Sequence, residues 1–278
     1  MISSDYLKIS IDSRLKEIES DKCERAFLGL NDIFDPEKSF LQEGKDLPMY
    51  NVKCRDGELY SSYQDRINQT PVASGNWSGA RGESLFKLNA TSENREANMI
   101  LNKHDISGIS YKNGIPEFSP IAIAEIDNPS MTVLRDDNYK KADSLLAADW
   151  TKIQKYGRDW TPRDISNWRR ENNYTWHECS DRHTMQLVPT EINSKFGHLG
   201  GVSEYKNLFD YANESYIKDS DLTKSDIAEM IKDDHIWEYN VGEDKFELVR
   251  KHPNEISDNL KNWQIDRLLA QKGDIFDE

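Results

Sequence analysis

The stretch from Tyr174 to Gly201 constrains the fold more than any other part of this chain, because a secondary-structure pattern and chemically active side chains coincide in it. Two short β-prone runs, 174–178 and 184–188, are separated by a polar link. A Pro-Thr-Glu sequence at 189–191 then opens a short helix, which must end at the glycine-rich 197–201. The side chains in this stretch that could do chemistry are His177, Glu178, Asp181, Asn193 and His198.

Such a strand–link–strand–helix unit could hold a single divalent ion through imidazole and through amide or carboxylate oxygens. A phosphodiester would then be cleaved by a water that a nearby base deprotonates. Asn193 and His198 are five residues apart, which is about 500° of an ideal helix and places them on different faces. Both can reach one ion only if the helix ends before His198, and Gly197 is placed to permit that.

Several short motifs together resemble a known family. They are T-W-H-E at 175–178, M-Q-L-V-P at 185–189, I-N at 192–193 and H-L-G-G at 198–201. Upstream, N-W-S-G-A-R-G-E-S at 76–84 and Y-K-N-G-I-P-E-F-S-P at 111–120 extend the resemblance over residues 63–205. The combination resembles the HNH/endonuclease VII nucleases found as toxin domains in bacterial polymorphic toxins, in particular the group whose first motif reads W-H-H.

The resemblance implies a ββα-metal (His-Me finger) core and hydrolysis of phosphodiester bonds in nucleic acid, with DNA favoured over RNA. It implies one divalent metal ion, such as Mg, Mn, Zn or Ni. It also implies an antibacterial effector that is neutralised by a cognate immunity protein, with delivery to a target cell after synthesis in the cytoplasm.

Two positions depart from the family pattern. Glu178 stands where the family has a histidine acting as general base, and Asn193 stands where it has a helix histidine. Matched by position, His177, Asn193 and His198 are the metal ligands and Glu178 is the base. An alternative assignment makes His177 the base and Glu178 a ligand. These two departures also leave open the interpretation that the chain is a catalytically impaired relative of the family, which binds nucleic acid or protein without cutting nucleic acid.

Other polar residues near these motifs have two interpretations each. Asp181 either orients a ligand or closes the turn, and His183 is expected to be a residue of the link. Arg81 either pairs with Glu83, which we expect, or contacts phosphate. A last group, Arg169 and Arg170, lies either on a solvated helix face or against the phosphate backbone.

Charge is unevenly distributed along the 278 residues, whose formal net charge is −14. Residues 1–50 carry 7 Lys+Arg against 11 Asp+Glu, and residues 201–278 carry 10 against 19, so the middle is nearly neutral. A nearly neutral middle segment that contains a local basic run fits nucleic-acid binding better than the net charge of the whole chain does. No stretch is long and apolar enough for a membrane helix, and the N-terminus lacks a signal-peptide pattern, so a chain made in the cytoplasm without membrane contact is expected.

Hydrophobic periodicity and turn signals predict an α+β protein. We expect a mainly helical N-terminal segment over 1–62, a nuclease domain over 63–205 and a small acidic α/β appendage over 206–278. The three scattered cysteines, Cys23, Cys54 and Cys179, are expected to be free thiols. Within the domains we predict helices over 93–102, 138–156, 161–172, 225–232 and 256–271, a strand over 121–126, and hairpins around Asn113-Gly114 and Gly242.

Overall fold

A computed structural model describes residues 59–243 and 245–270, together with the backbone of 51–53. The chain divides into two units, Met1–Pro48 and Met49–Glu278, and the described residues belong to the second. The helical prediction for residues 1–50, as well as Cys23 and Cys54, therefore lies outside the described residues. The described part is α+β, as predicted, and its strands form small antiparallel sheets.

The predicted hairpin is present and supplies two strands of a three-stranded sheet with the order β6-β8-β7, in which β8 is the central strand. Strand β7 (Tyr174–Glu178) pairs with β8 (Thr184–Pro189), so that Trp176 lies opposite Leu187 and His177 opposite Gln186. Strand β6 (Ala124–Asp127) begins three residues later than predicted, because residues 118–122 form a turn that buries Ile121 in the neighbouring core.

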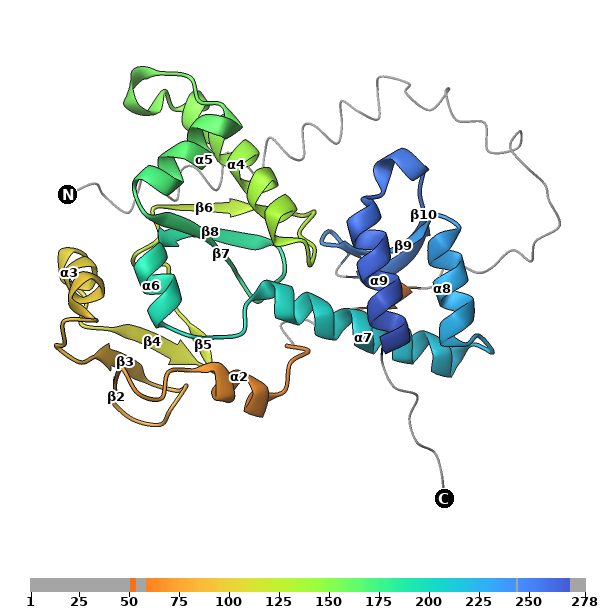
Figure 1. Ribbon diagram of the computed structural model, residues 1–278, viewed down its shortest axis with the longest axis horizontal. Coiled ribbons are helices and arrows are strands. Elements are labelled where there is room, and N and C mark those ends of the chain that lie inside the picture. Colours follow the sequence, from red (N-terminus) through yellow and green to blue (C-terminus); the bar gives the residue numbers. More distant parts are fainter. Residues whose placement is uncertain (1–50, 54–58, 244, 271–278) are drawn as a thin grey trace. The chain divides into compact units, whose positions relative to one another are not determined.

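Two helices cover one face of this sheet, as Figure 1 shows. Helix α4 (Arg135–Lys152) begins earlier than predicted and ends before the short 3-10 turn η1 (Lys155–Gly157). Helix α5 (Pro162–Glu171) begins as predicted, with Thr161 and Asp164 forming a capping box. The core between these helices and the sheet contains Trp150, Trp160, Trp176, Met185 and Leu187.

A second, four-stranded sheet has the order β2-β3-β4-β5. Its strands are β2 (Gly75–Trp77), β3 (Leu85–Leu88), β4 (Ile109–Lys112) and β5 (Ile115–Pro116), and it is accompanied by α2 (Tyr63–Gln69) and α3 (Arg95–Lys103). The Asn113-Gly114 hairpin is confirmed, since both residues have positive φ angles, 54° and 77°. Ile192 on helix α6 (Thr190–Lys195) and Phe196, which caps the C-terminus of this helix, pack into the core of this sheet.

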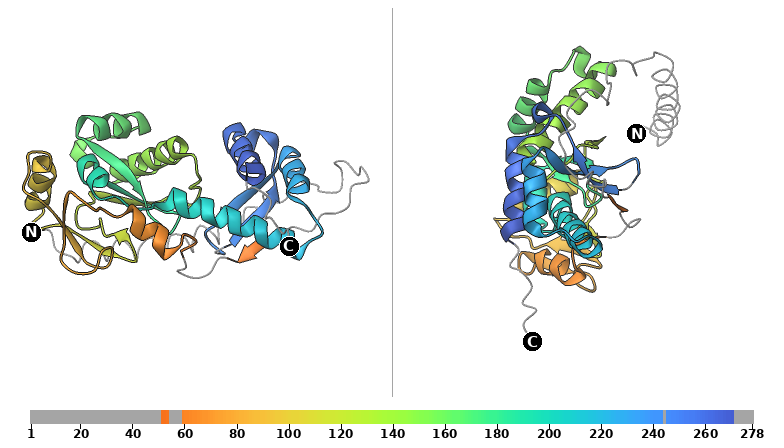
Figure 2. Two further views of the ribbon diagram at one scale, coloured as in Figure 1. Left: turned by 60° about the horizontal axis from the view of Figure 1, so that its bottom comes forward. Right: turned by 90° about the vertical axis from the view of Figure 1, so that its right-hand side faces the viewer.

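The C-terminal part is built on α7 (Gly201–Asp219), a helix that sequence reasoning missed because it interpreted the adjoining glycines as a stop. The predicted α8 (Lys224–Lys232) and α9 (Asp258–Ala270) are present, with η2 (Pro253–Glu255) before α9. The predicted hairpin is also present, as β9 (His235–Asn240) and β10 (Lys245–Arg250). Strand β1 (Asn51–Lys53) pairs with β10, so a segment assigned to the N-terminal region completes the C-terminal sheet (Figure 2).

Helix α7 crosses residue 205, where we placed the second domain boundary, so the three-part division stays a proposal. Among the described residues, no helix combines the length and the apolar character that crossing a membrane requires.

Candidate active site

The β7–β8–α6 unit brings most of the predicted site residues around one pocket of about 240 Å³. His177 and Glu178 come from the end of β7, Asn193 from α6, and His198 from the segment after α6. Successive residues of a strand face opposite sides, so His177 and Glu178 enter the pocket from different faces of the hairpin. One side of the pocket thus carries imidazoles and an amide, and the other carries a carboxylate.

The two histidines form the closest pair of predicted ligands. His198 Nε2 lies 3.2 Å from His177 Nδ1, and His198 Nδ1 lies 2.8 Å from the carbonyl oxygen of Phe196. The carbonyl can only accept, so His198 carries its proton on Nδ1 and directs the lone pair of Nε2 toward His177. Phe118 packs edge-on against both rings, with centroids 4.9 and 5.6 Å away, and fixes their orientation.

Both imidazoles are held neutral. Burial, together with the neighbouring His198, lowers the pKa of His177 to about 3. Burial also lowers the pKa of His198, and the charge of Arg135 acts in the same direction. Neutral imidazole is the form that binds metal ions, so both rings are in the required state at physiological pH.

Asn193 supplies an oxygen at the same place. Its Oδ1 is buried and makes no hydrogen bond of normal geometry to any described residue, although the amide is near enough to His177 to favour the protonated ring. A buried acceptor without a donor is unusual and points to an absent partner. The helix ends at Lys195, before His198, as the spacing required. Gly197 contributes by close approach instead of by special φ, since a Cβ there would lie 2.6 Å from the carbonyl oxygen of Gln69.

These three groups fit a divalent ion. Two nitrogen ligands on one tetrahedral zinc-type ion, each about 2.1 Å from it, are about 3.4 Å apart, close to the 3.2 Å that separates the two ring nitrogens. The orphaned amide oxygen would complete a three-residue set with open positions left over. The described residues contain no group of three His, Cys, Asp or Glu side chains that could hold a metal, so the fit depends on this asparagine.

Glu178 is held on the opposite face by α4. Asn138 Nδ2 donates to its Oε1 at 2.7 Å, and Arg135 Nε donates to its Oε2 at 3.1 Å. Burial raises the pKa of Glu178, while Asn138 and Arg135 act to lower it. Among the side chains that the structure describes, each carboxylate oxygen accepts one hydrogen bond, which leaves Glu178 able to accept a proton from water.

Comparison with known proteins places these residues in a family. Residues 108–200 match the family model described as the DNase/tRNase domain of colicin-like bacteriocin. This part of the chain is a nuclease toxin domain of the colicin-like type. Neither the curated proteins nor the solved structures contain a significant match to the chain. The colicin-like domain covers all of β4 to α6 and ends two residues after His198.

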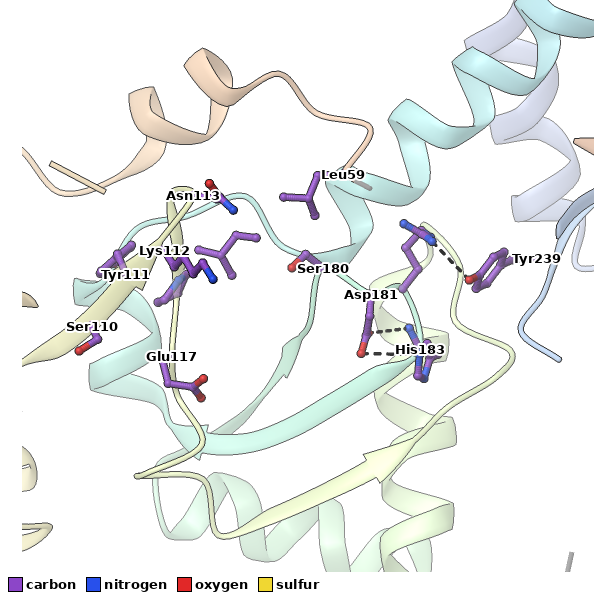
Figure 3. Close-up of a pocket in the computed structure, with 13 residues that line it drawn as sticks. Leu59, Ser110, Tyr111, Lys112, Asn113, Glu117, Ser180, Asp181, His183 and Tyr239 are labelled. Carbon is purple, nitrogen blue, oxygen red and sulfur yellow. Dashed lines mark hydrogen bonds and ion pairs between the residues drawn. The ribbon is translucent and has the colours of Figure 1, made fainter. Parts of the chain in front are cut away.

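One predicted site residue lies apart from the others in the colicin-like domain. Asp181 Oδ1 accepts hydrogen bonds from the backbone N–H groups of His183 and Thr184, at 3.1 and 2.8 Å, which favours the turn-closing interpretation. It lines a different, open cleft of about 760 Å³. Figure 3 shows Asp181 beside His183 on one side of this cleft and Lys112 with Glu117 on the other.

The three arginines that we predicted to bind nucleic acid differ in burial and in hydrogen bonding. Arg169 is buried and donates from Nε and Nη2 to the two oxygens of Asp143, at 2.7 and 2.9 Å, so we do not assign it to phosphate binding. Arg170 is exposed on α5. The expected pairing of Arg81 with Glu83 was wrong. Arg81 instead donates to Thr70 Oγ1 and to the carbonyl oxygens of Thr70 and Asn68.

Sequence reasoning missed Arg135 and Asn138, which hold Glu178 in the colicin-like domain. They are three residues apart at the start of α4, a spacing that places them on one helix face. That spacing could have indicated a shared role, but it could not identify the partner of both residues. Glu178 lies 43 residues after Arg135 and 40 residues after Asn138.

Proposed function

We propose that the chain is a divalent-metal-dependent endonuclease that hydrolyses phosphodiester bonds in nucleic acid, with DNA favoured over RNA. The observation that carries this proposal is the orphaned Oδ1 of Asn193 beside the neutral pair His177 and His198. The colicin-like domain supports the nuclease class, and the DNA preference and the W-H-H type of site remain part of the proposal.

In this proposal His177, Asn193 and His198 hold the ion. When bound, a divalent ion would offset negative charge on the attacked phosphate and on the leaving oxygen. Glu178 accepts a proton from the attacking water through a free acceptor position. The reverse assignment, with His177 as base and Glu178 as ligand, is less consistent with the geometry, because Arg135 and Asn138 hold Glu178 away from the imidazole pair.

Two imidazoles and one amide oxygen also narrow the choice among Mg, Mn, Zn and Ni. Imidazole suits Zn and Ni, whereas Mg prefers carboxylate and water oxygens. We therefore expect Zn or Ni to bind more tightly than Mg.

The decisive experiment is cleavage of supercoiled plasmid and of total RNA by the full chain, with EDTA, Mg, Mn, Ni or Zn. Cleavage of plasmid with a divalent ion is expected, together with its loss in EDTA and in a His177→Ala, His198→Ala double variant. Thermal unfolding with each metal gives a second readout, in which the double variant should lose the stabilisation. The absence of cleavage with every metal would instead support the impaired binding protein.

The biological role that we propose is an antibacterial toxin. Domains of the colicin-like family act on nucleic acid and pair with immunity proteins, and we expect a cognate immunity protein here. Growth arrest on expression in bacteria, relieved in the double variant, would support this role, and unimpeded growth with an active enzyme would contradict it.

A further inference from the structure

Two glycines join the candidate site to the C-terminal part of the molecule. Gly200 lies at the N-cap position of α7, and Gly201 is the first residue of this helix. Gly200 has a φ angle of −96° and Gly201 is helical, so both backbones lie in regions that any residue adopts. A residue other than glycine would also favour the helix more at position 201. The reason for the pair therefore lies in what a side chain would contact.

Both glycines lie directly against the end of β7. A Cβ atom on Gly201 would lie 2.2 Å from the carbonyl oxygen of Cys179, a separation that a real Cβ atom does not adopt. A Cβ atom on Gly200 would lie 3.0 Å from the carbonyl oxygen of Glu178 and 3.8 Å from Nε2 of His198. The first turn of α7 thus packs backbone to backbone on the strand that carries one half of the site, immediately after the segment that carries His198.

The rest of α7 is held in the C-terminal core, so its first turn cannot shift on its own. Glu204, which has no exposed surface, accepts hydrogen bonds from the backbone N–H groups of Tyr60 and Ser61. Three apolar side chains of the helix are also buried in that core: Tyr205, Leu208 and Phe209. Because such close-packed interiors transmit strain, a displacement at Gly201 would be felt at His198, three residues earlier.

We propose that Gly200 and Gly201 are positioning residues of the metal site: because they lack side chains, the first turn of α7 holds His198 in place for the ion. This inference rests on the proposed function, because it takes an ion bound by His177, Asn193 and His198 as the ligand. It also extends the functional unit into the C-terminal part of the molecule, since the colicin-like match ends at residue 200. The competing explanation is that the two glycines serve only the stability of the fold.

Isothermal titration of the metal-free full chain with Zn²⁺ or Ni²⁺ separates these explanations. Gly201→Ala must move α7 away from Cys179, so we expect the metal affinity to fall about 10- to 100-fold, the range for residues that orient a metal ligand. Gly75→Ala on β2 is the matched control, because its Cβ would lie 2.1 Å from the carbonyl oxygen of Lys87. This control should lower the unfolding temperature in EDTA and leave the metal affinity unchanged.

A second variant covers the case in which Gly201→Ala does not fold. Gly200→Ala introduces a milder contact, since its Cβ would lie 3.0 Å from the nearest backbone oxygen, and we expect a severalfold loss of metal affinity. Gly242→Ala, whose Cβ would meet its nearest atom at 3.6 Å, should change neither stability nor affinity. Folded glycine variants that are less stable in EDTA but bind the ion as tightly as the parent would overturn the positioning role.

A double variant shows whether Gly201 acts through His198. If Gly201→Ala displaces this ligand, adding His198→Ala should weaken metal binding no further. Additive losses would show that Gly201 acts elsewhere and would overturn the proposed route.

The same titrations distinguish this inference from the proposed function. A parent that binds neither ion would overturn the metal site of the proposed function, and the role of the glycines with it. A parent that binds an ion, with both glycine variants binding it equally well, would overturn the role of the glycines alone.

Discussion

At the scale of single residues, the polar side chains of the candidate site differ in charge and in hydrogen bonding. His177 and His198 are neutral, and Asn193 has a buried acceptor that makes no hydrogen bond of normal geometry to a described residue. Glu178, in contrast, is bonded on both oxygens to side chains of α4. The pocket therefore separates a set of uncharged potential ligands from a carboxylate whose position is fixed.

The buried histidines predict how stability depends on pH in the metal-free protein. The pKa of His177 is about 3 when folded and about 6.5 when unfolded, so between these values only the unfolded chain binds the proton. The stabilising contribution is complete above about pH 6.5 and is lost as the pH falls toward 3. Urea unfolding in EDTA should show this decrease, by at most about 1.4 kcal/mol per pH unit for one group. A His177→Gln variant should show a shallower slope, and an identical slope would mean that His177 is not buried as a neutral ring.

Glu178→Gln tests the proposed role of Glu178 as general base. The amide retains an acceptor for Asn138 but cannot take a proton, so plasmid cleavage should fall by about 100-fold or more while the protein stays folded. Glu178→His provides the comparison. Activity that appears only in the histidine variant, with an inactive parent, would show that the natural chain is impaired at this position.

At the scale of elements, a buried ion pair connects helices α4 and α5 to strand β7. Asp143 on α4 accepts from Arg169 on α5 and, through Oδ1, from Trp176 Nε1 on β7 at 2.8 Å. This arrangement explains why a basic pair on α5 contains one structural and one exposed arginine. Trp176 directly precedes His177 and Glu178 in β7 and also lines the pocket, so these contacts anchor the strand that carries both residues.

Removing Arg169 should therefore destabilise the protein without a direct effect on phosphate binding. Arg169→Ala leaves the buried Asp143 carboxylate without its charged partner, a change that costs about 3–5 kcal/mol. Arg170→Ala, on the exposed side of the same helix, should cost less than about 0.5 kcal/mol. The free energies of unfolding in urea give both values, and equal effects of the two substitutions would contradict the assignment.

At the scale of the described molecule, Glu204 links residues that are distant in sequence. It lies in the first turn of α7, has no exposed surface, and accepts from the backbone N–H groups of Tyr60 and Ser61 and from the hydroxyl of Ser61. Arg66 on α2 donates to the carbonyl oxygen of Ser61 and to Asn113 O in the β4–β5 turn. Helix α7, the segment before α2 and the hairpin of the second sheet thus share one polar network.

Glu204→Ala should loosen this network. The buried N–H of Ser61 and the partly buried N–H of Tyr60 would lose their acceptor, at a cost of about 1–3 kcal/mol for the buried donor and less for the other. We expect a lower unfolding temperature and faster amide hydrogen exchange at Tyr60 and Ser61, whereas Glu214→Ala, an exposed change on the same helix, should alter neither. Unchanged exchange in Glu204→Ala would show that the network does not hold this segment.

Local pattern was sufficient for much of the fold and for naming four residues that the structure brings around one pocket, His177, Glu178, Asn193 and His198. Alternating apolar residues predicted β7 and β8, the capping box predicted the start of α5, and the Asn-Gly pair predicted the β4–β5 turn, because each signal acts between near neighbours. The spacing of Asn193 and His198 also predicted that α6 ends before His198, and the helix ends at Lys195.

The tertiary structure decided the rest, since it depends on contacts between residues far apart in the chain. It showed that Arg169 is buried against Asp143, that α4 brings Arg135 and Asn138 to Glu178, and that β1 completes the C-terminal sheet. The sequence did not predict helix α7, because a pair of glycines is a local stop signal. Tyr205, Leu208 and Phe209 on this helix pack into a core, and this packing explains why the helix forms there.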